Sequence, residues 1–310
     1  MGERVSGVKA SIGFASDKGP RERNEDFGGA VFGPELPQPR GDVVAAVADG
    51  IGGAKSGRVA AETAVRGFLD GFCDLPETME VRRAGARVLN ALNSWIYSEG
   101  KRNPEAAGLG CTFTALALRG RVAHVLHVGD TRAYRLGGDR LMVLTRDHVR
   151  DDGAGRSNIL NRALGVETEV RLDYVSQSVA RHDRFLLCSD GVHGFLTDDT
   201  IAEILRERSA SEDTARALVA AALDLVDRTE QARVAAVRHQ YLQHEAVDCL
   251  AVDRHRDQRQ LHHGGADIDR VRGRQVHNVD HQGGAVVGAA VVERGRHQRA
   301  RRVLGGGALA

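Results

Sequence analysis

Four apolar stretches follow one another between Cys111 and Thr145 with only short turns between them, and this run most constrains the fold. They read "CTFTALAL", "VAHVLHV", "RAYRL" and "LMVLT", and each has the length and β-rich composition of a strand. Strands joined by so few residues pair antiparallel, because a parallel pair needs a crossover connection of a dozen residues or more. The run therefore predicts an antiparallel sheet.

Helical patterns lie outside this run. Two amphipathic stretches follow the apolar strand "DVVAAVADG": one between Ala54 and Phe72, the other with an apolar face from Val81 to Ile96 that includes Trp95. Thr197 or Asp198 is a candidate N-cap for a further helix. Helices grouped apart from consecutive strands predict an α+β protein, with antiparallel sheets and helices packed outside them.

The composition changes near residue 228. From Thr229 onward the chain has 13 arginines and 8 of its 13 histidines, but no Phe, Trp or Lys. Such a segment has little apolar surface to offset its ordering entropy. We therefore predict a globular domain over 8–228 and an atypical Arg/His/Gly-rich tail over 229–310. We expect the tail to be disordered or to result from a change of reading frame.

Bulk properties exclude several classes of protein. The formal net charge is +1, which favours neither nucleic acid nor an anionic membrane as partner. An Arg-rich arm that binds nucleic acid is a weaker hypothesis, because acidic residues are interspersed and stacking aromatics are lacking. The four cysteines form no CxxC pair, and no apolar stretch reaches the length of a membrane span. A cytoplasmic monomer is the expectation.

Acidic residues recur where apolar strands end. Asp49-Gly50, Asp130 and Asp190 each close such a strand, and Glu25-Asp26 follow the first one. If these strand ends meet at one edge, their carboxylates repel one another unless a cation neutralises them. An all-oxygen set of this kind selects Mg²⁺ or Mn²⁺. A single Asp-Gly is more often only a turn, so the prediction of a metal site depends on their recurrence.

The stretch "RERNED" adds arginine to this acidic group. Arg21 and Arg23 lie beside Glu25 and Asp26. A surface salt-bridge cluster is the simple interpretation; the alternative is a site that handles phosphate and a divalent cation together. Arginine suits phosphate because its guanidinium can donate two parallel hydrogen bonds.

Seven motifs occur in the order found in one family. The chain resembles the metal-dependent type 2C serine/threonine protein phosphatases in their bacterial form. The segments that carry the resemblance are "SDKGPRERNED", "VADGIGGAKSG", "GCTFTALAL", "HVGDTRAYRL", "LTRDH", "LNRALG" and "LLCSDGVHGFL".

The resemblance implies an α-β-β-α sandwich with a centre of two Mn²⁺ or Mg²⁺ ions, and a third ion in bacterial members. Asp49 would bridge two ions, Gly50 would offer its carbonyl, and Asp190 would hold one ion. Asp130 would support the third. Glu25 and Asp26 would also lie at the metal centre, and Arg21 would bind the substrate phosphate.

The implied activity is hydrolysis of phosphoserine and phosphothreonine in proteins by a metal-activated water. Substrates would be phosphorylated proteins, among them a Ser/Thr kinase or its targets, in bacterial signalling. Asp49 and Arg21 would be the catalytic residues. His148 and His193 lie near the motifs, and we expect both to be structural. The alternative is a pseudophosphatase that binds phosphoproteins without turnover.

One departure concerns the end of the domain. The family's last motif is Asp-Asn followed by a strand, and no Asp-Asn pair occurs here after Asp190. Asp248 and Asp253 are poor candidates to replace it. We therefore expect a sandwich that lacks the family's last strand, with impaired metal binding and activity.

Overall fold

The computed structural model describes residues 10–32, 43–51, 56–106, 108–150, 159–207, 209–231 and 287–294. The chain forms two compact units, Met1–Asp224 with Gly284–Ala310, and Leu225–Gly283. All labelled strands and helices belong to the first unit.

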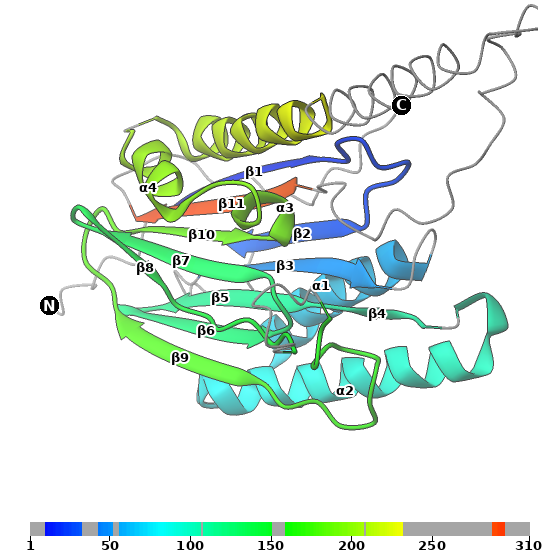
Figure 1. Ribbon diagram of the computed structural model, residues 1–310. Helices are drawn as coiled ribbons and strands as arrows, with labels where there is room; N and C mark the ends of the chain where they lie inside the picture. Colours follow the sequence, from blue (N-terminus) through cyan, green and yellow to red (C-terminus); the bar gives the residue numbers. More distant parts are fainter. Residues whose placement is uncertain are drawn as a thin grey trace, which may run out of the picture. The chain divides into compact units, whose positions relative to one another are not determined.

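Two antiparallel sheets form the centre of the first unit (Figure 1). One has the order β1-β11-β10-β7-β8, and the other has the order β2-β3-β5-β6-β9, with β4 paired to β3. The strands are β1 (Ala10–Asp17), β2 (Asp26–Phe32), β3 (Val43–Ile51), β4 (Gly110–Cys111), β5 (Phe113–Arg119), β6 (Val122–Val128), β7 (Arg132–Gly137), β8 (Arg140–Val143), β9 (Asp173–Ser178), β10 (Arg184–Cys188) and β11 (Val287–Arg294).

Helices cover the outer faces of the sheets. The helices α1 (Ser56–Asp74) and α2 (Val81–Arg102) lie on the β2–β9 sheet, and α4 (Asp198–Arg206) packs on β7 and β8 of the other (Figure 1). Two shorter helices are η2 (Pro104–Ala106) and α3 (Asp190–His193), and residues 211–231 are helical. The predicted α+β class, with antiparallel sheets flanked by helices, is confirmed. None of the described helices is long and apolar enough to cross a bilayer.

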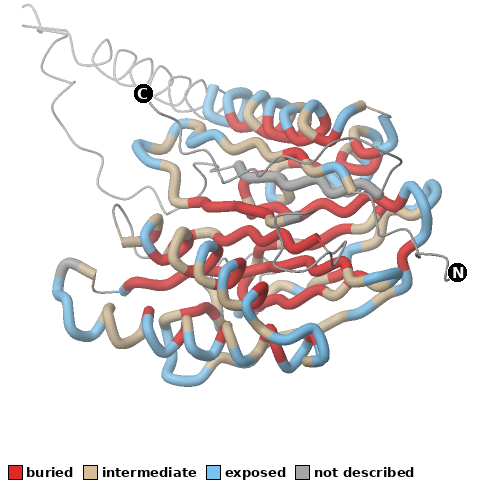
Figure 2. Tube along the Cα trace, turned by 180° about the vertical axis from the view of Figure 1, so that it is seen from behind, coloured by how far each residue is buried: buried red, intermediate tan, exposed pale blue. Residues whose placement is uncertain are grey.

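Alternation along the central strands builds the two cores. On β3, Val44, Ala46 and Ala48 pack toward the helices, whereas Val43, Ala45 and Val47 pack in the cluster shared with the other sheet. Because successive side chains of a strand point to opposite faces, a strand apolar throughout is buried on both sides. Figure 2 shows the resulting buried positions along the inner strands.

The helices follow the predicted patterns with one exception. Thr197 is the N-cap of α4, and its side chain accepts a hydrogen bond from the Thr200 backbone N–H at 3.2 Å. Trp95, however, is 50% exposed on α2, although the sequence pattern placed it on the apolar face. The buried face contains Asn93 instead, because its amide bonds the 165–168 loop: it donates to Glu167 and Thr168 oxygens and accepts from Gly165 N–H.

The strand β11 corrects one expectation, that the sandwich lacks its last strand. Residues 287–294 pair antiparallel with β1 on one side and with β10 on the other, so the sheet does have a closing strand. Without it, β1 and β10 would each present unpaired N–H and C=O groups inside the sheet. Strand pairing uses backbone atoms, so this position can be filled without the family's Asp-Asn motif. Asp248 and Asp253 lie outside the described residues, and the origin of the tail stays a prediction.

Substituting Ala290→Pro should lower the free energy of unfolding, because Ala290 pairs with Phe14 of β1 and Leu187 of β10. Proline removes one N–H donor and leaves a carbonyl of the ladder without its partner, which costs about 1–3 kcal/mol. Urea denaturation measures the change.

Two truncations provide the control. A chain ending at Arg294 keeps β11, whereas a chain ending at Val286 loses it, so the difference between the two isolates the strand. Equal stability of the two truncated chains would show that β11 contributes nothing to the fold.

Candidate functional site

The acidic residues that end the strands meet at one edge of the sandwich. Asp26 begins β2 and is the direct cross-strand partner of Asp49 on β3. Asp190 begins α3 directly after β10, and Asp130 follows β6. The carboxylates of Asp26, Asp130 and Asp190 all act electrostatically on Asp49. The predicted convergence of the strand-end aspartates is therefore present in the fold.

Asp26 is the most buried member of this acidic cluster, which consists of Asp26, Asp49, Asp130 and Asp190. Its side chain is 2% exposed, and Oδ2 accepts a hydrogen bond of 2.6 Å from the Ser189 hydroxyl. The other oxygen, Oδ1, is buried and receives no hydrogen bond from an N–H or hydroxyl donor, while the Asp49 carboxyl, a second acid, lies within hydrogen-bonding reach of Asp26. A buried carboxylate oxygen without such a donor is costly, so this atom is suited to a cation.

The electrostatics at Asp26, Asp49 and Asp130 favour protonated carboxyls when no cation is bound. Burial, reinforced by the Asp190 carboxylate, raises the pKa of Asp26 to about 8, and the Arg21 guanidinium partly opposes the rise. Burial and the other aspartates raise the pKa of Asp49 well above its ordinary value. Burial with Asp190 raises the pKa of Asp130 to about 7. These shifts follow from carboxylates crowded in a poorly solvated place.

The main chain around Asp49 is tied to its neighbours. The Asp49 N–H donates to Thr112 Oγ1 at 3.0 Å, and the Thr112 N–H donates to the Asp49 carbonyl at 2.9 Å. Gly50 pairs with Cys111, and its N–H donates to the Glu25 carbonyl at 3.3 Å. These bonds connect the predicted ligands Glu25, Asp49 and Gly50 through the backbone.

Gly50 also permits a close approach of α1. A Cβ added at Gly50 would lie 2.2 Å from the Gly57 carbonyl carbon, and one added at Gly57 would lie 3.3 Å from the Glu25 carboxyl carbon. Larger side chains would therefore push α1 away from the strand end. Nearby, Arg58 of α1 donates to the Asp26 carbonyl at 2.6 Å and lies over the Phe27 ring.

The loop that carries Arg21 is held at both ends. Arg21 N–H donates to the Lys18 carbonyl at 3.3 Å, and Asn24 accepts from Asp26 N–H at 3.0 Å while donating to Ser16 Oγ. Arg21 is partly exposed and near enough to Asp26 to affect its pKa. A guanidinium that lies beside the carboxylates and is accessible to solvent can bind a phosphate group.

The carboxylates do not stand in a chelating arrangement. Within the described ranges, no three His, Cys, Asp or Glu side chains are close enough together to hold one metal ion at once. The donor set nevertheless fits a hard divalent cation, because it consists of oxygens only and includes the unpartnered Asp26 Oδ1. Binding would require the side chains to turn toward a shared ion.

Sequence reasoning missed several residues that hold the acidic cluster. Ser189 was not singled out, although it lies inside "CSDG", and Thr112 lies inside "GCTFT". Arg58 had no motif to mark it. Their roles depend on partners 163, 63 and 32 residues away in the chain, respectively, and local patterns cannot reveal such partners.

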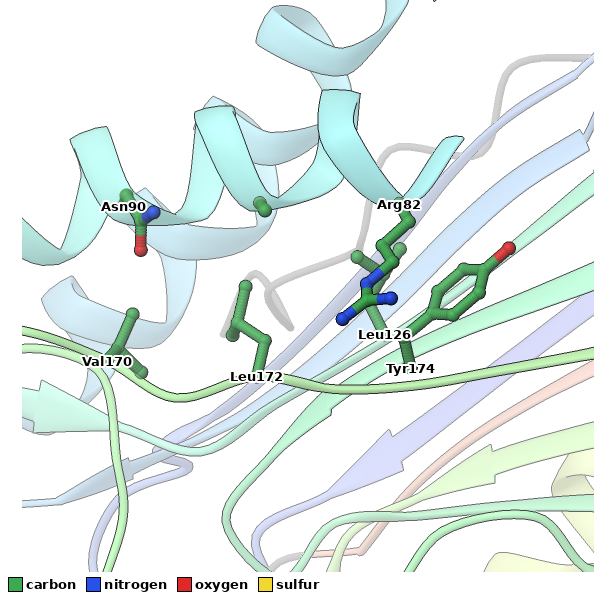
Figure 3. Close-up of a pocket in the computed structure, with 7 residues that line it drawn as sticks. Arg82, Asn90, Leu126, Val170, Leu172 and Tyr174 are labelled. Atoms are coloured by element: carbon green, nitrogen blue, oxygen red, sulfur yellow. The ribbon is translucent and has the colours of Figure 1, made fainter. Parts of the chain in front are cut away.

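A separate hollow of about 150 Å³ lies between α2 and the segment that leads into β9 (Figure 3). Leu126, Val170 and Leu172 line it, and Arg82 lies over the Tyr174 ring at 5.9 Å from its centroid. None of its lining residues is a carboxylate, a cysteine or a histidine. The acidic cluster is therefore the stronger candidate for the functional site.

Comparisons with known proteins point to one family. A family model described as protein phosphatase 2C matches residues 36–237. The serine/threonine phosphatase stp of Listeria innocua is 33% identical over 218 residues, which cover 64% of this chain and 84% of that protein. The serine/threonine protein phosphatase PstP of Mycobacterium tuberculosis is 31% identical over 186 residues. The matched part covers 55% of this chain and 36% of PstP.

Solved structures show the same fold. A structure of the S. agalactiae serine/threonine phosphatase aligns with a TM-score of 0.66 at 20% identity, and covers 92% of this chain and 99% of that one. At that identity the likeness concerns the fold alone.

Without divalent cations, stability should fall as the pH rises from about 6.5 to about 8. The folded protein holds protons on Asp26 (pKa about 8) and Asp130 (pKa about 7), whose ordinary value is 3.8, so the unfolded chain releases them first. Burial lowers the pKa of His127 from 6.5 to about 4. This residue makes stability rise with pH, but only below pH 6.5, so it does not affect the range considered.

Thermal unfolding in EDTA at pH 6.5, 7.2 and 8.0 measures this dependence. Asp26→Asn should flatten it, whereas the exposed Asp74→Asn should leave it unchanged. A stability that rises over this pH range would contradict the electrostatics described above.

Proposed function

Because the chain belongs to the protein phosphatase 2C family, and is thus a protein-serine/threonine phosphatase, we propose that its acidic cluster binds divalent cations that the hydrolysis requires. The observation that carries the proposal is the buried Asp26 Oδ1 without a partner, among aspartates whose pKa values are raised. A cation would neutralise these carboxylates and complete the coordination of that oxygen. Mn²⁺ and Mg²⁺ suit the all-oxygen donors, with two ions and a third at Asp130.

Each site residue has a distinct proposed role. Asp49, central among the carboxylates, would bridge two ions; the Gly50 carbonyl would serve as a ligand, and Asp190 would hold one ion. Asp26 and Glu25 would complete the centre. Bound cations would supply activation of water and stabilisation of negative charge on the phosphoryl group.

Arg21 would orient the substrate. Its guanidinium can donate two hydrogen bonds to a phosphate, and its partial exposure leaves it accessible to a phosphorylated side chain of another protein. The substrates are phosphoproteins; a Ser/Thr kinase or its targets in bacterial signalling are the proposed physiological ones. The position after Asp49-Gly50 is Ile51, which has no group that could protonate the leaving oxygen.

The chain's C-terminal part bears on the level of activity. The sequence has no Asp-Asn pair after Asp190, so the metal centre would lack one carboxylate found in the family. We propose that this weakens cation binding and lowers turnover. The proposed boundary after residue 228 therefore separates a domain that has the family's motifs from a segment that lacks the last of them. The strand β11 of that segment nevertheless completes the sheet.

Replacing Asp49→Asn should have opposite effects on activity and on stability without metal. Hydrolysis of a phosphothreonine peptide with Mn²⁺ should fall at least about 100-fold, because a bridging ligand is lost. In EDTA the melting temperature should rise, because the Asp49 carboxyl must take up a proton when the chain folds at neutral pH and a neutral amide need not.

Peptide turnover and thermal unfolding with and without Mn²⁺ measure both effects, and Asp74→Asn serves as the control. If the unmodified chain binds phosphopeptide but turns it over no faster than Asp49→Asn at saturating Mn²⁺, the protein is a pseudophosphatase instead.

Replacing residues 229–310 by a family-type ending, with Asp-Asn before a β-rich strand, should raise Mn²⁺ affinity. Loss of a residue that only supports a metal ligand costs about 10- to 100-fold in metal affinity, so an added ligand should raise the affinity by at least about tenfold. Titration of turnover with Mn²⁺ measures the gain. The same chimera carrying Ala-Asn is the control, and equal turnover of the two chimeras would refute the proposed impairment.

A further inference from the structure

The turn that carries Asp130 is held by residues from outside its own hairpin. Gly129 adopts a φ of +105°, and a Cβ at this position would lie 2.5 Å from Thr112 Cβ, so the turn packs directly on the residue that binds Asp49. The turn cannot move toward Thr112, and its orientation depends on its remaining polar contacts.

His148 makes two hydrogen bonds to Gly129. Its backbone N–H donates to the Gly129 carbonyl at 2.7 Å, and its Nδ1 accepts from the Gly129 N–H at 3.1 Å. The side chain is 5% exposed, so no bulk water competes for these bonds. The imidazole and the backbone of His148 therefore bind both main-chain groups of Gly129, the residue directly before Asp130.

The second ring nitrogen of His148 also has a partner, and the two bonds together select one tautomer of the ring. Because Nδ1 accepts, the ring proton lies on Nε2, which donates to Asp173 Oδ2 at 3.0 Å. Arg162 donates to the other oxygen of Asp173 at 3.2 Å. Its Nη1 also lies 3.3 Å from Nε2, but a guanidinium only donates, so with the ring proton on Nε2 this approach is a contact and not a hydrogen bond. Asp173 therefore keeps His148 in the tautomer that can accept the Gly129 N–H.

His193 holds the other side of the same turn. Its Nε2 lies 2.9 Å from the Asp130 carbonyl oxygen, and because a carbonyl only accepts, Nε2 must donate. His193 ends the short helix that Asp190 begins. This bond therefore links the Asp130 turn to the helix that carries a second member of the acidic cluster.

These contacts exceed what packing requires. His148 also lies 4.8 Å from the His127 ring, centroid to centroid, and an apolar side chain could fill the same space. The side-chain bonds of the two histidines to this turn, however, end on backbone groups of two consecutive residues, the Gly129 N–H and the Asp130 carbonyl. A positioning role explains this arrangement, and packing alone does not.

We propose that His148, kept in its tautomer by Asp173, and His193 are positioning residues that together hold the Gly129–Asp130 turn, so that the Asp130 carboxylate stays directed at the acidic cluster. The inference rests on the proposed function, because the position of Asp130 matters to catalysis only if the cluster binds cations.

The two histidines use different ring nitrogens, and this difference provides the test. The amide of Asn places an atom near the position of Nδ1, whereas the longer Gln places one near Nε2. His148→Asn can still accept the Gly129 N–H through its amide oxygen, and His148→Gln cannot. Conversely, His193→Gln can still donate to the Asp130 carbonyl, and His193→Asn is too short. The tolerated residue should therefore be Asn at position 148 and Gln at position 193.

Three readouts decide the outcome for these four variants. We expect His148→Gln and His193→Asn to weaken Mn²⁺ binding, measured by calorimetry, about tenfold, and to lower peptide turnover at limiting Mn²⁺. Excess Mn²⁺ should restore that turnover. His148→Asn and His193→Gln should stay within about twofold of the unmodified chain. Amide exchange at Gly129 should accelerate in His148→Gln and not in His148→Asn.

His124 supplies the matched control. It lies on β6, and its Nδ1 bonds the Tyr174 hydroxyl at 2.8 Å rather than the turn. His124→Asn and His124→Gln should change neither Mn²⁺ binding nor exchange at Gly129. In an Asp130→Asn background, His148→Gln should cause no further loss of Mn²⁺ affinity.

Equal effects of Asn and Gln at both positions would overturn the proposal, because a role in packing alone does not distinguish them. If one His148 variant fails to fold, the His193 pair decides alone. If the unmodified chain binds no Mn²⁺ and shows no metal-dependent turnover, the proposed function fails. Amide exchange at Gly129 still tests the positioning role in that case.

Discussion

Carboxylates withdrawn from water at one edge of two sheets are the constraint on which the rest of the structure depends. Asp26 and Asp49 face each other across β2 and β3, and Asp190 is brought to them by β10. Crowded charges of one sign in a poorly solvated place cost free energy in the folded state. The fold therefore needs either protons or cations at this edge, and a phosphatase of this family can use cations for its chemistry.

The surrounding residues hold the carboxylates against that cost. Ser189 binds Asp26, Thr112 binds both main-chain groups of Asp49, and the contact of Gly50 with Gly57 brings α1 against the strand end. The two histidines extend the same principle to Asp130. In each case the side chain or turn is fixed by a partner from another element, so the site is only as rigid as the packing of the sheets. This explains why β11, distant in sequence, bears on the site: it joins β1 to β10, which leads directly into Asp190.

How much could be predicted differs between elements. The strands of the central meander and the helix α1 were identified from alternation and from apolar spacing, because both periodicities are local properties. The exposure of Trp95 could not be predicted in this way, because the buried face of α2 is decided by the 165–168 loop, to which Asn93 is hydrogen-bonded. The closing strand was missed for a similar reason. Residues 287–294 follow a long segment poor in large apolar residues. Their pairing depends on the facing edges of β1 and β10, between which they lie, rather than on a motif of their own.

The sequence by itself determined the family, the antiparallel α+β class and the acidic residues at the ends of apolar strands, because motifs, periodicity and residue chemistry are all readable along the chain. Only the tertiary structure decided that Asp26 is the most buried member of the cluster, with one oxygen that receives no hydrogen bond. It also decided that Ser189 bonds Asp26 and that Thr112 bonds Asp49. The same holds for His148 and His193, which bond one turn. The physical reason is that burial and hydrogen bonding between distant residues depend on distances in space, and spacing along the chain does not encode those distances.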